Sequence, residues 1–494
     1  MSARTIPARP WQPVTWSFTR RPGVTDMIEK SPELSAGDAA PRSERFPLAA
    51  RALRMSTPVP AAIDALPGAG VLAAPARPGL HPKAKATAKV ASNWALYAFL
   101  FLLPLQNIHA GYLPNFGGGL NFLNMGFGLS LLGVWLVRGH LAPNEPVNRW
   151  VLVYSIYSVI SLFISYQYVS NTGSHANILK DHLTGVFMLY LVQMSVNDWT
   201  GVRRIVLATI LPLPYIAKVT WIEHVSVSSW NYSDDLRIKG TFMLLGANEF
   251  AAFCVTVAVV LFAVLVAAKT SRLWKMLLLG GIASMVIGIM YAYSRTAYIA
   301  ALLGLATVIL AWRGRWKMML PLLLAAAILP PILPTSVVQR FDSTTVDEGQ
   351  RDKSTEMRFE FWKIAWDNFL SHPVVGTGFQ SFRHPEINPY KMDTHNVYLR
   401  TLSEGGAIGG AILLGLLFSV LRTARRELSA SVSGSWRYAL ALGLVGAWMG
   451  MVCGNLFGDR FTYYPVIAYF WTYVALVVKA RHLPADPLAP GTRK

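Results

Sequence analysis

The chain has 494 residues, of which 53% are hydrophobic and only 14% are charged, whereas about 25% of the residues in an ordinary soluble domain are charged. The formal net charge is +19, but the basic residues fall in short clusters between apolar runs, which argues against nucleic acid as a partner. The apolar runs are too many and too long for one soluble core, so the composition predicts an all-α, polytopic membrane protein.

The N-terminal region differs from the rest of the chain. Residues 1–92 are rich in Pro, Ala and Arg and have no apolar stretch at the extreme N-terminus, so no cleavable signal sequence is visible. A composition of this kind is typical of a disordered segment. We expect residues 1–92 to be a cytoplasmic tail.

About twelve apolar segments follow, each close to the roughly 20 residues that a membrane-spanning helix needs. The expected spans are 93–107, 119–138, 149–168, 182–197, 203–222, 246–268, 274–292, 296–312, 317–334, 398–421, 437–457 and 462–479. They divide the chain into nine helices in residues 93–334, a large loop in 335–397, three helices in 398–479 and a short tail in 480–494.

Basic residues occur in alternate connections between these spans. Arg203, Arg313 and Arg422 each lie in a basic cluster, whereas residues 108–118 contain no Arg or Lys. Because Arg and Lys are enriched in the cytoplasmic loops of membrane proteins, this alternation predicts that both termini are cytoplasmic. Residues 335–397 then form a large periplasmic loop, where we expect the extracytoplasmic chemistry to be concentrated.

The segment STEMRFEFWKIAWDNFLSHP inside this loop predicts an amphipathic helix, with Ser354 and Thr355 as caps. Its aromatic residues recur at three- and four-residue spacing: Phe359, Trp362, Trp366 and Phe369. Such a helix is expected to lie in the membrane interface, or else to pack on the bundle with one face toward solvent. In both cases it would cover the site as a lid.

Three charged residues lie close to the ends of apolar spans, where a charge is costly unless it is paired or used. Arg295 follows a span with almost no loop. It is either a fixed cation at the mouth of a cavity or an arginine whose side chain extends to the lipid headgroups. Arg237 is a second candidate cation, or the partner of Asp234 or Asp235 in a surface ion pair. Glu249, at the apolar start of a span, indicates a polar lining of the site, or else it pairs with a nearby Arg or Lys.

His395 lies just before the span 398–421. A lone loop histidine usually makes only local hydrogen bonds, but its imidazole can also take up a proton near neutral pH. Two arginines could neutralise a diphosphate leaving group, while the histidine acts as general base toward an acceptor hydroxyl. No DxD-type acidic box is evident outside the membrane, so we expect no metal or other cofactor. The donor would be a sugar on a lipid diphosphate.

The chain resembles bacterial O-antigen ligases, O-antigen polymerases and related O-oligosaccharyltransferases. His395-Asn396, nine further residues and then Gly406 and Gly409 match their H-[N/S/Q]-x9-G-x-x-[G/T/Y] pattern. The segments RFEFWKIAWDNFLSHPVVGTGFQSF, SRTAYIAALLGL and RIKGTFMLLGANEFAAF resemble their external loop, their Ser-Arg helix start and their Arg-x-x-Gly segment. In the last of these, LLGANE stands where an Asn-Pro-Asn turn is common. The resemblance covers about residues 200–420.

The resemblance implies a GT-C-like bundle in the bacterial inner membrane that transfers a glycan from undecaprenyl diphosphate to an acceptor hydroxyl. It implies His395 as catalytic base and Arg237, Arg295 and Arg358 as contacts to the diphosphate donor. Four residues would support the site: Asn396, Glu249, Gly406 and Gly409. Gly406 and Gly409 would share a helix face and admit a neighbouring helix or a lipid chain.

Three functions agree with these features. We favour a polymerase of O-antigen or exopolysaccharide, because one organism can hold several polysaccharide pathways that each need a polymerase. The alternative is an O-antigen ligase that acts on lipid A-core or protein. A transporter of a small anion or a lipid-linked glycan is the second alternative. Expected partners are the lipid-linked glycan, the glycan or lipid A-core acceptor, membrane lipids, and a chain-length regulator or flippase.

Overall fold

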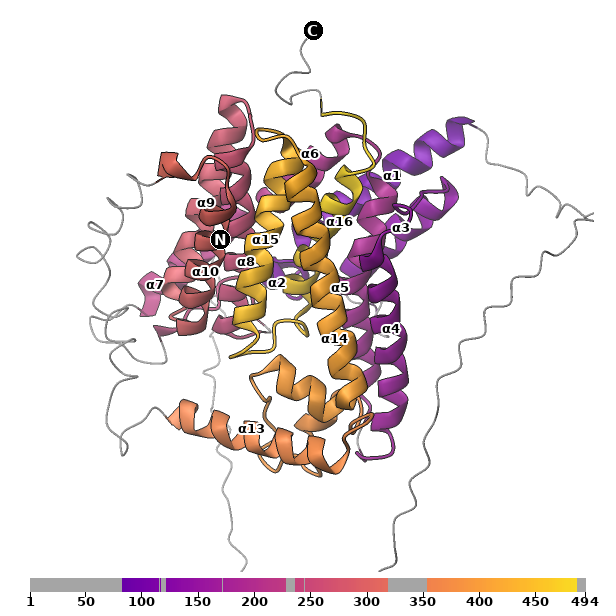
Figure 1. Ribbon diagram of the computed structural model, residues 1–494, viewed down its shortest axis with the longest axis vertical. Coiled ribbons are helices and arrows are strands. Elements are labelled where there is room, and N and C mark those ends of the chain that lie inside the picture. Colours follow the sequence, from indigo (N-terminus) through magenta and orange to yellow (C-terminus); the bar gives the residue numbers. More distant parts are fainter. Residues whose placement is uncertain are drawn as a thin grey trace, which may run out of the picture. The chain divides into compact units, whose positions relative to one another are not determined.

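The computed structural model describes residues 82–114, 116, 121–170, 172–227, 236–243, 245–318 and 353–486. The helices in these ranges are α1 (Pro82–Leu102), α2 (Gln106–His109), α3 (Phe122–Leu136), α4 (Pro146–Ser165), α5 (His175–Ser195), α6 (Trp199–Ile210), α7 (Leu213–Val227), α8 (Ala247–Ala267), α9 (Arg272–Tyr291), α10 (Arg295–Ala311), α13 (Lys353–Ser371), α14 (Val397–Ala430), α15 (Trp436–Gly454) and α16 (Tyr464–Ala480). Short 3-10 turns lie at Arg315–Met318 and Ser381–Arg383. No strand occurs in the described ranges, which confirms the predicted all-α class (Figure 1).

The described helices have the length and composition of a polytopic membrane protein. Six helical segments are long and apolar enough to cross a membrane: α4, the pair α6–α7, α8, α9, α14 and α15. Three shorter helices, α3, α10 and α16, are also apolar. The predicted ninth span, 317–334, lies almost entirely outside the described residues, as do residues 335–352 of the large loop.

Polar caps and prolines in the sequence set several helix ends. The side chains of Asn121, Asp198 and Ser271 accept backbone N–H bonds at the starts of α3, α6 and α9. The predicted span 203–222 is divided between α6 and α7, and Pro212 lies between them. Proline cannot donate the helical hydrogen bond and its ring clashes with the preceding turn, which accounts for this break.

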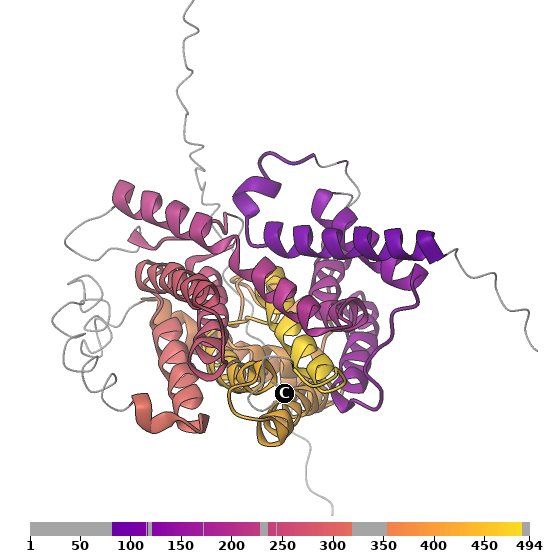
Figure 2. The same ribbon diagram turned by 90° about the horizontal axis from the view of Figure 1, so that it is seen from above.

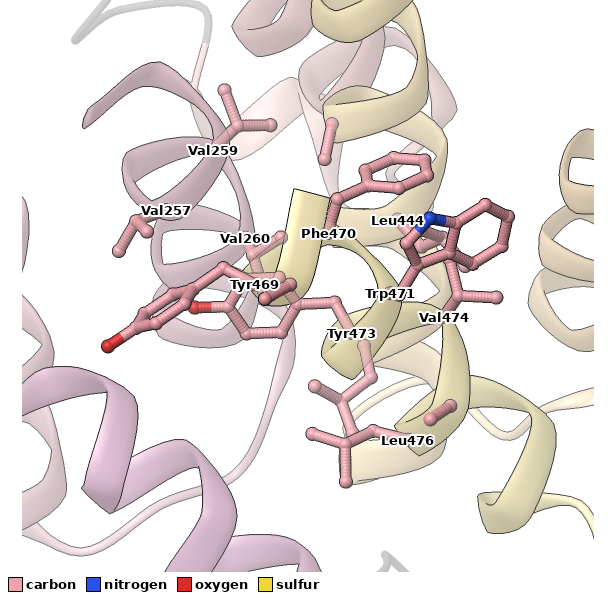
Figure 3. Packing of buried hydrophobic residues seen from close by; sticks show 14 of the residues in the cluster. Val257, Val259, Val260, Leu444, Tyr469, Phe470, Trp471, Tyr473, Val474 and Leu476 are labelled. Carbon is pink, nitrogen blue, oxygen red and sulfur yellow. The ribbon is translucent and has the colours of Figure 1, made fainter. Parts of the chain in front are cut away.

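Helix α16 is buried along almost its whole length and lies in the middle of the bundle (Figure 2). Tyr469 of α16 lies close to Val260 of α8, whereas Trp471 lies beside Leu444 of α15 (Figure 3). Around this core, Gly304 of α10 lies against Gly446 of α15, where a side chain on either glycine would meet the other's carbonyl. Small residues thus let these two backbones approach closely, as in other membrane bundles.

Helix α14 has one break in its helical backbone, at Gly406, where φ is 60° and ψ is −163°. A loop that follows α13 docks at this break. The N–H of Thr377 donates to the carbonyl of Ser403 (3.1 Å), and the N–H of Ile408 donates to the carbonyl of Val374 (3.2 Å). These bonds satisfy backbone groups that the break releases from the helix. The loop therefore fixes the first turns of α14 relative to α13.

Replacing Gly406 with Ala is expected to destabilise the protein by at least about 1–3 kcal/mol, because only glycine adopts this backbone conformation without strain. In addition, the new Cβ would overlap the carbonyl of Val374. Thermal unfolding of the purified protein in detergent measures the effect. Gly280→Ala in α9 is the matched control, because no atom lies within 4 Å of its added Cβ. Equal stability of the two variants would contradict this account of the break.

Candidate active site

His395 lies in the turn immediately before α14. Its φ is 51°, a left-handed conformation that is uncommon outside glycine and is frequent at functional sites. The next residue, Asn396, caps α14: its side-chain oxygen accepts the N–H groups of Tyr398 (3.0 Å) and Leu399 (3.1 Å). The predicted His-Asn pair therefore combines a strained histidine with the cap that orients it.

The environment of His395 favours its neutral form. Burial lowers the pKa of the His395 imidazole; the carboxylate of Asp393 opposes this shift and the guanidinium of Arg358 adds to it. Asp393 itself stays ionised: burial would raise its pKa, but Arg383 and Arg400 outweigh this and hold the pKa at about 2. A neutral imidazole near neutral pH is the form that can accept a proton.

The turn that carries His395 is held by two neighbouring elements. Asp393 accepts a charged hydrogen bond from Arg383 (2.8 Å). Trp362 of α13 donates its indole N–H to the carbonyl of Thr394 (2.9 Å). These bonds hold the chain on the N-terminal side of His395, and the Asn396 cap holds it on the C-terminal side.

Asn248, at the start of α8, binds the side chain of Arg237 and the residue that precedes Arg295. The Asn248 side-chain oxygen accepts from the Arg237 guanidinium (2.6 Å) and from the hydroxyl of Ser294 (2.8 Å). Ser294 is the residue before Arg295, at the start of α10. The N–H of Ile238 also donates to the carbonyl of Tyr291 at the end of α9 (3.1 Å). Arg237 and the start of α10, where Arg295 follows Ser294, are therefore both bound to Asn248, although they are far apart in the sequence.

Glu249 is buried and has a specific partner, Arg460, which lies in the loop between α15 and α16. The Arg460 guanidinium donates to the Glu249 carboxylate (2.8 Å), and its side chain is only 3% exposed. The Arg460 N–H donates to the side chain of Asn455, whose carbonyl accepts the N–H of Val397 at the start of α14. Both Glu249 and Arg460 act on the pKa of His395. This pair therefore joins the α8 end of the site to the α14 end.

Arg460 could not be predicted as part of the site from local sequence. Its one visible signal is a charge in the short connection LFGDRF between two apolar spans, where an unpaired charge is costly. Arg400 of α14 and Asp459 of the same connection were also missed. They form a buried ion pair that lies one turn beyond Asn396.

Arg358 and the helix that carries it lie beside His395. The predicted amphipathic helix is α13, which runs across the end of α14 and packs on it through Phe361 and Ala365 (Figure 1). Phe359 and Trp366 lie on its other side and are 56% and 45% exposed. This arrangement leaves an aromatic face open next to the site. The side chains of the predicted caps, Ser354 and Thr355, lie outside the described residues.

The two glycines of the motif have different surroundings. Gly406 forms the backbone break and contacts the loop at Val374, so it does not continue a regular helix face. A side chain at Gly409 would meet the ring of Tyr157 of α4 at 3.2 Å. Tyr157 donates its hydroxyl to the carbonyl of Gly405 (2.5 Å), one residue before the break. Both glycines thus permit close approach, one by a loop and the other by a helix.

Removing the charge of Arg460 is expected to destabilise the fold strongly. Arg460→Met would leave the Glu249 carboxylate buried without its cation, and breaking a buried ion pair from one side costs about 3–5 kcal/mol. Adding Glu249→Gln should restore part of this loss, because the double variant no longer buries an unpaired charge. Denaturant unfolding of the single and double variants in detergent gives the comparison. Additive losses would contradict a direct pair.

The described residues contain no group of three or more His, Cys, Asp or Glu side chains with metal-site geometry. What they bring together is Arg237 bound to Asn248, a buried Glu249–Arg460 pair, and a neutral histidine at the start of a helix. Guanidinium groups bind phosphate oxygens at two points, and a neutral imidazole accepts protons. The arrangement therefore suits transfer of a group from a phosphate-linked donor to a hydroxyl.

Comparison with known protein families gives a match for one part of the chain. Residues 280–414 match the family model described as O-antigen ligase. The match includes Arg295, Arg358 and His395, whereas Arg237 precedes it and Arg460 follows it. No curated protein matches the chain. The match supports the resemblance to O-antigen ligases for this part of the chain.

Proposed function

We propose that this chain transfers a glycan from undecaprenyl diphosphate to an acceptor hydroxyl. The proposal starts from the match of residues 280–414 to the O-antigen ligase family model. The reaction would take place on the periplasmic face of the bacterial inner membrane. The observation that carries this proposal is the convergence at one end of the bundle: a neutral His395 shares an electrostatic environment with Arg358, Glu249 and Arg460.

In this reaction His395 takes the proton of the acceptor hydroxyl as that oxygen attacks the anomeric carbon of the donor sugar. The bond between this carbon and the diphosphate oxygen breaks, and its electron pair leaves with the diphosphate. Arg237 and Arg295 stabilise the charge that develops on the leaving oxygen, and Arg358 contacts the carrier or the glycan. No step requires a metal ion.

The distribution of charge supports the orientation. Basic side chains at the end opposite α13 are bound to buried carboxylates or to helix-terminal carbonyls: Arg426 contacts Glu145 (2.6 Å), Arg437 contacts Glu427 (2.6 Å), and Arg313 donates to the carbonyl of Ser431 (3.0 Å). Enrichment of Arg at this end is typical of the cytoplasmic side. We infer that residues 1–92 and 480–494 are cytoplasmic and that residues 335–397 are periplasmic.

Within this reaction class we favour a polymerase, which adds growing chain to a lipid-linked repeat unit. The alternative, a ligase, moves finished chain to lipid A-core or to protein. The site residues serve both, since both use a lipid diphosphate donor and a hydroxyl acceptor. A chain-length regulator or a flippase would act with either enzyme.

A deletion strain distinguishes these functions when it is complemented with wild-type protein or with His395→Ala at matched abundance. Lipopolysaccharide, extracellular polysaccharide and the lipid-linked pool are then resolved by size. Single repeats left on the carrier or on lipid A would identify a polymerase, whereas full-length chains on the carrier would identify a ligase. His140→Ala, an exposed histidine, is the control. A deletion that changes no glycan would favour the transporter instead.

A further inference from the structure

The stretch LRIKGT, residues 236–241, lies between α7 and α8, outside both helices. We refer to it as the Arg237 segment. Leu236, Ile238 and Gly240 of this segment are buried. Backbone N–H groups that are buried outside a helix still need hydrogen-bond partners, and these partners decide where the segment lies.

Glu223 of α7 accepts hydrogen bonds from two of these groups. Its Oε2 accepts the N–H of Gly240 (2.8 Å), and its Oε1 accepts the N–H of Lys239 (3.2 Å). Successive backbone N–H groups that point the same way form a concavity that binds an anion, and here the anion is a side chain of the same protein. Hydrogen bonds to an ionised acceptor are also stronger than those between neutral groups. The Glu223 carboxylate therefore holds the backbone of the Arg237 segment against α7.

Gly240 makes this close approach possible. Its φ is 55°, a left-handed conformation that glycine adopts without strain. A side chain at this position would overlap the ring of Phe250 (2.6 Å) and would lie 2.9 Å from the hydroxyl of Thr220. Thr220 lies one turn before Glu223 on α7, so the backbone at Gly240 rests directly on the helix face that carries the carboxylate.

The other contacts of the segment lead to the candidate active site. The N–H of Ile238 donates to the carbonyl of Tyr291, and the guanidinium of Arg237 donates to Asn248 (2.6 Å). The segment is thus held by α7 at Gly240, by the end of α9 at Ile238, and by α8 at Arg237. A group that stabilises a transition state must be placed accurately, since an error of about 1 Å can cost roughly 10²-fold in rate.

We propose that Glu223 is a positioning residue of the diphosphate site, which acts through the backbone of the Arg237 segment and does not touch the substrate. Glu223 lies just beyond the apolar stretch 203–222, where a carboxylate is costly unless it is paired or used. Its two bonds to the segment are the use that the structure shows. This inference rests on the proposed function, because it takes Arg237 as a contact to the diphosphate leaving group.

A double-mutant cycle on the full chain in lipid nanodiscs tests this role. Glu223→Ala removes both acceptor oxygens, whereas Glu223→Gln keeps one, and each is made alone and together with Arg237→Lys. Ser226→Ala is the matched control on the same helix, because the exposed Ser226 hydroxyl donates to a carbonyl of α7 itself. The kcat for transfer of purified lipid-linked glycan is measured for every variant. Thermal unfolding shows which variants are folded, and Glu223→Gln carries the comparison if Glu223→Ala is not.

Glu223→Ala is expected to lower kcat by about ten- to hundredfold, Glu223→Gln by less, and Ser226→Ala not at all. In the Arg237→Lys background the Glu223 substitutions should cost less than about threefold, because the guanidinium that Glu223 positions is no longer there.

Two results would overturn the inference and leave the proposed function standing. In the first, Glu223→Ala keeps the wild-type kcat. In the second, it causes the same loss with and without Arg237→Lys, which would make Glu223 a residue of general structural importance. If the wild-type protein itself transfers no glycan, the proposed function fails, and the inference fails with it.

Discussion

Replacing His395 with Ala or Gln is expected to lower the rate of glycan transfer by about 10²–10⁴-fold, the usual contribution of a general base. The backbone at His395 is held at the start of α14 by the Asn396 cap and by the turn that Trp362 and Asp393 stabilise. Gln preserves much of the shape of the side chain and its ability to donate hydrogen bonds, but it cannot take up the proton. Binding of the lipid-linked donor should therefore change much less than the rate.

The pH dependence of the same reaction gives an independent readout. The rate should rise with pH as His395 loses its proton, and it should reach half of its maximum below the ordinary histidine pKa of about 6.5, because burial lowers this pKa. The Arg358 cation lowers the pKa further, so Arg358→Met should move the half-maximal pH upward. A profile that is unchanged by Arg358→Met would remove Arg358 from the environment of the base.

Replacing Arg295 with Lys is expected to reduce kcat by about 10²–10³-fold, comparable to losing one donor to a developing charge. Lys keeps the charge but lacks the planar fork that binds phosphate oxygens at two points. Arg237→Lys should have an effect of the same order, because we propose that both arginines bind the same diphosphate. Steady-state transfer with purified lipid-linked glycan measures both variants.

Arg272→Lys is the control for these substitutions, since Arg272 is exposed at the start of α9, a full helix length away from Arg295. The two active-site substitutions should combine non-additively, because they act on the same diphosphate. If Arg295→Lys and Arg237→Lys both retain the wild-type rate, the leaving group is held elsewhere and the assignment of the diphosphate site is wrong.

The sequence alone was sufficient to predict those structural features that are determined within one short segment of the chain. The apolar runs predicted the helical membrane class, and the aromatic spacing predicted α13 as an amphipathic helix. The His395-Asn396 pair lies at a helix start, as its place before an apolar run indicated. In each of these cases the pattern and the structure that it determines lie within about 20 neighbouring residues.

Contacts between distant segments could not be predicted. Glu249 and Arg460 are 211 positions apart, and only the folded bundle shows that each is the other's partner. The break at Gly406 depends on a loop more than 25 residues earlier, which no periodic pattern within α14 can reveal. The division of 203–222 at Pro212 had a visible signal, but the strong apolar character of the segment suggested one continuous span.

The most direct test of the central claim is to reconstitute the purified chain in liposomes with a lipid-linked glycan and an acceptor, and to quantify free undecaprenyl diphosphate together with transferred glycan. Our account predicts one undecaprenyl diphosphate released for each glycan bond formed, and neither product with His395→Gln. Movement of the lipid-linked glycan across the bilayer with its sugar–phosphate bond intact would contradict it and would identify a transporter.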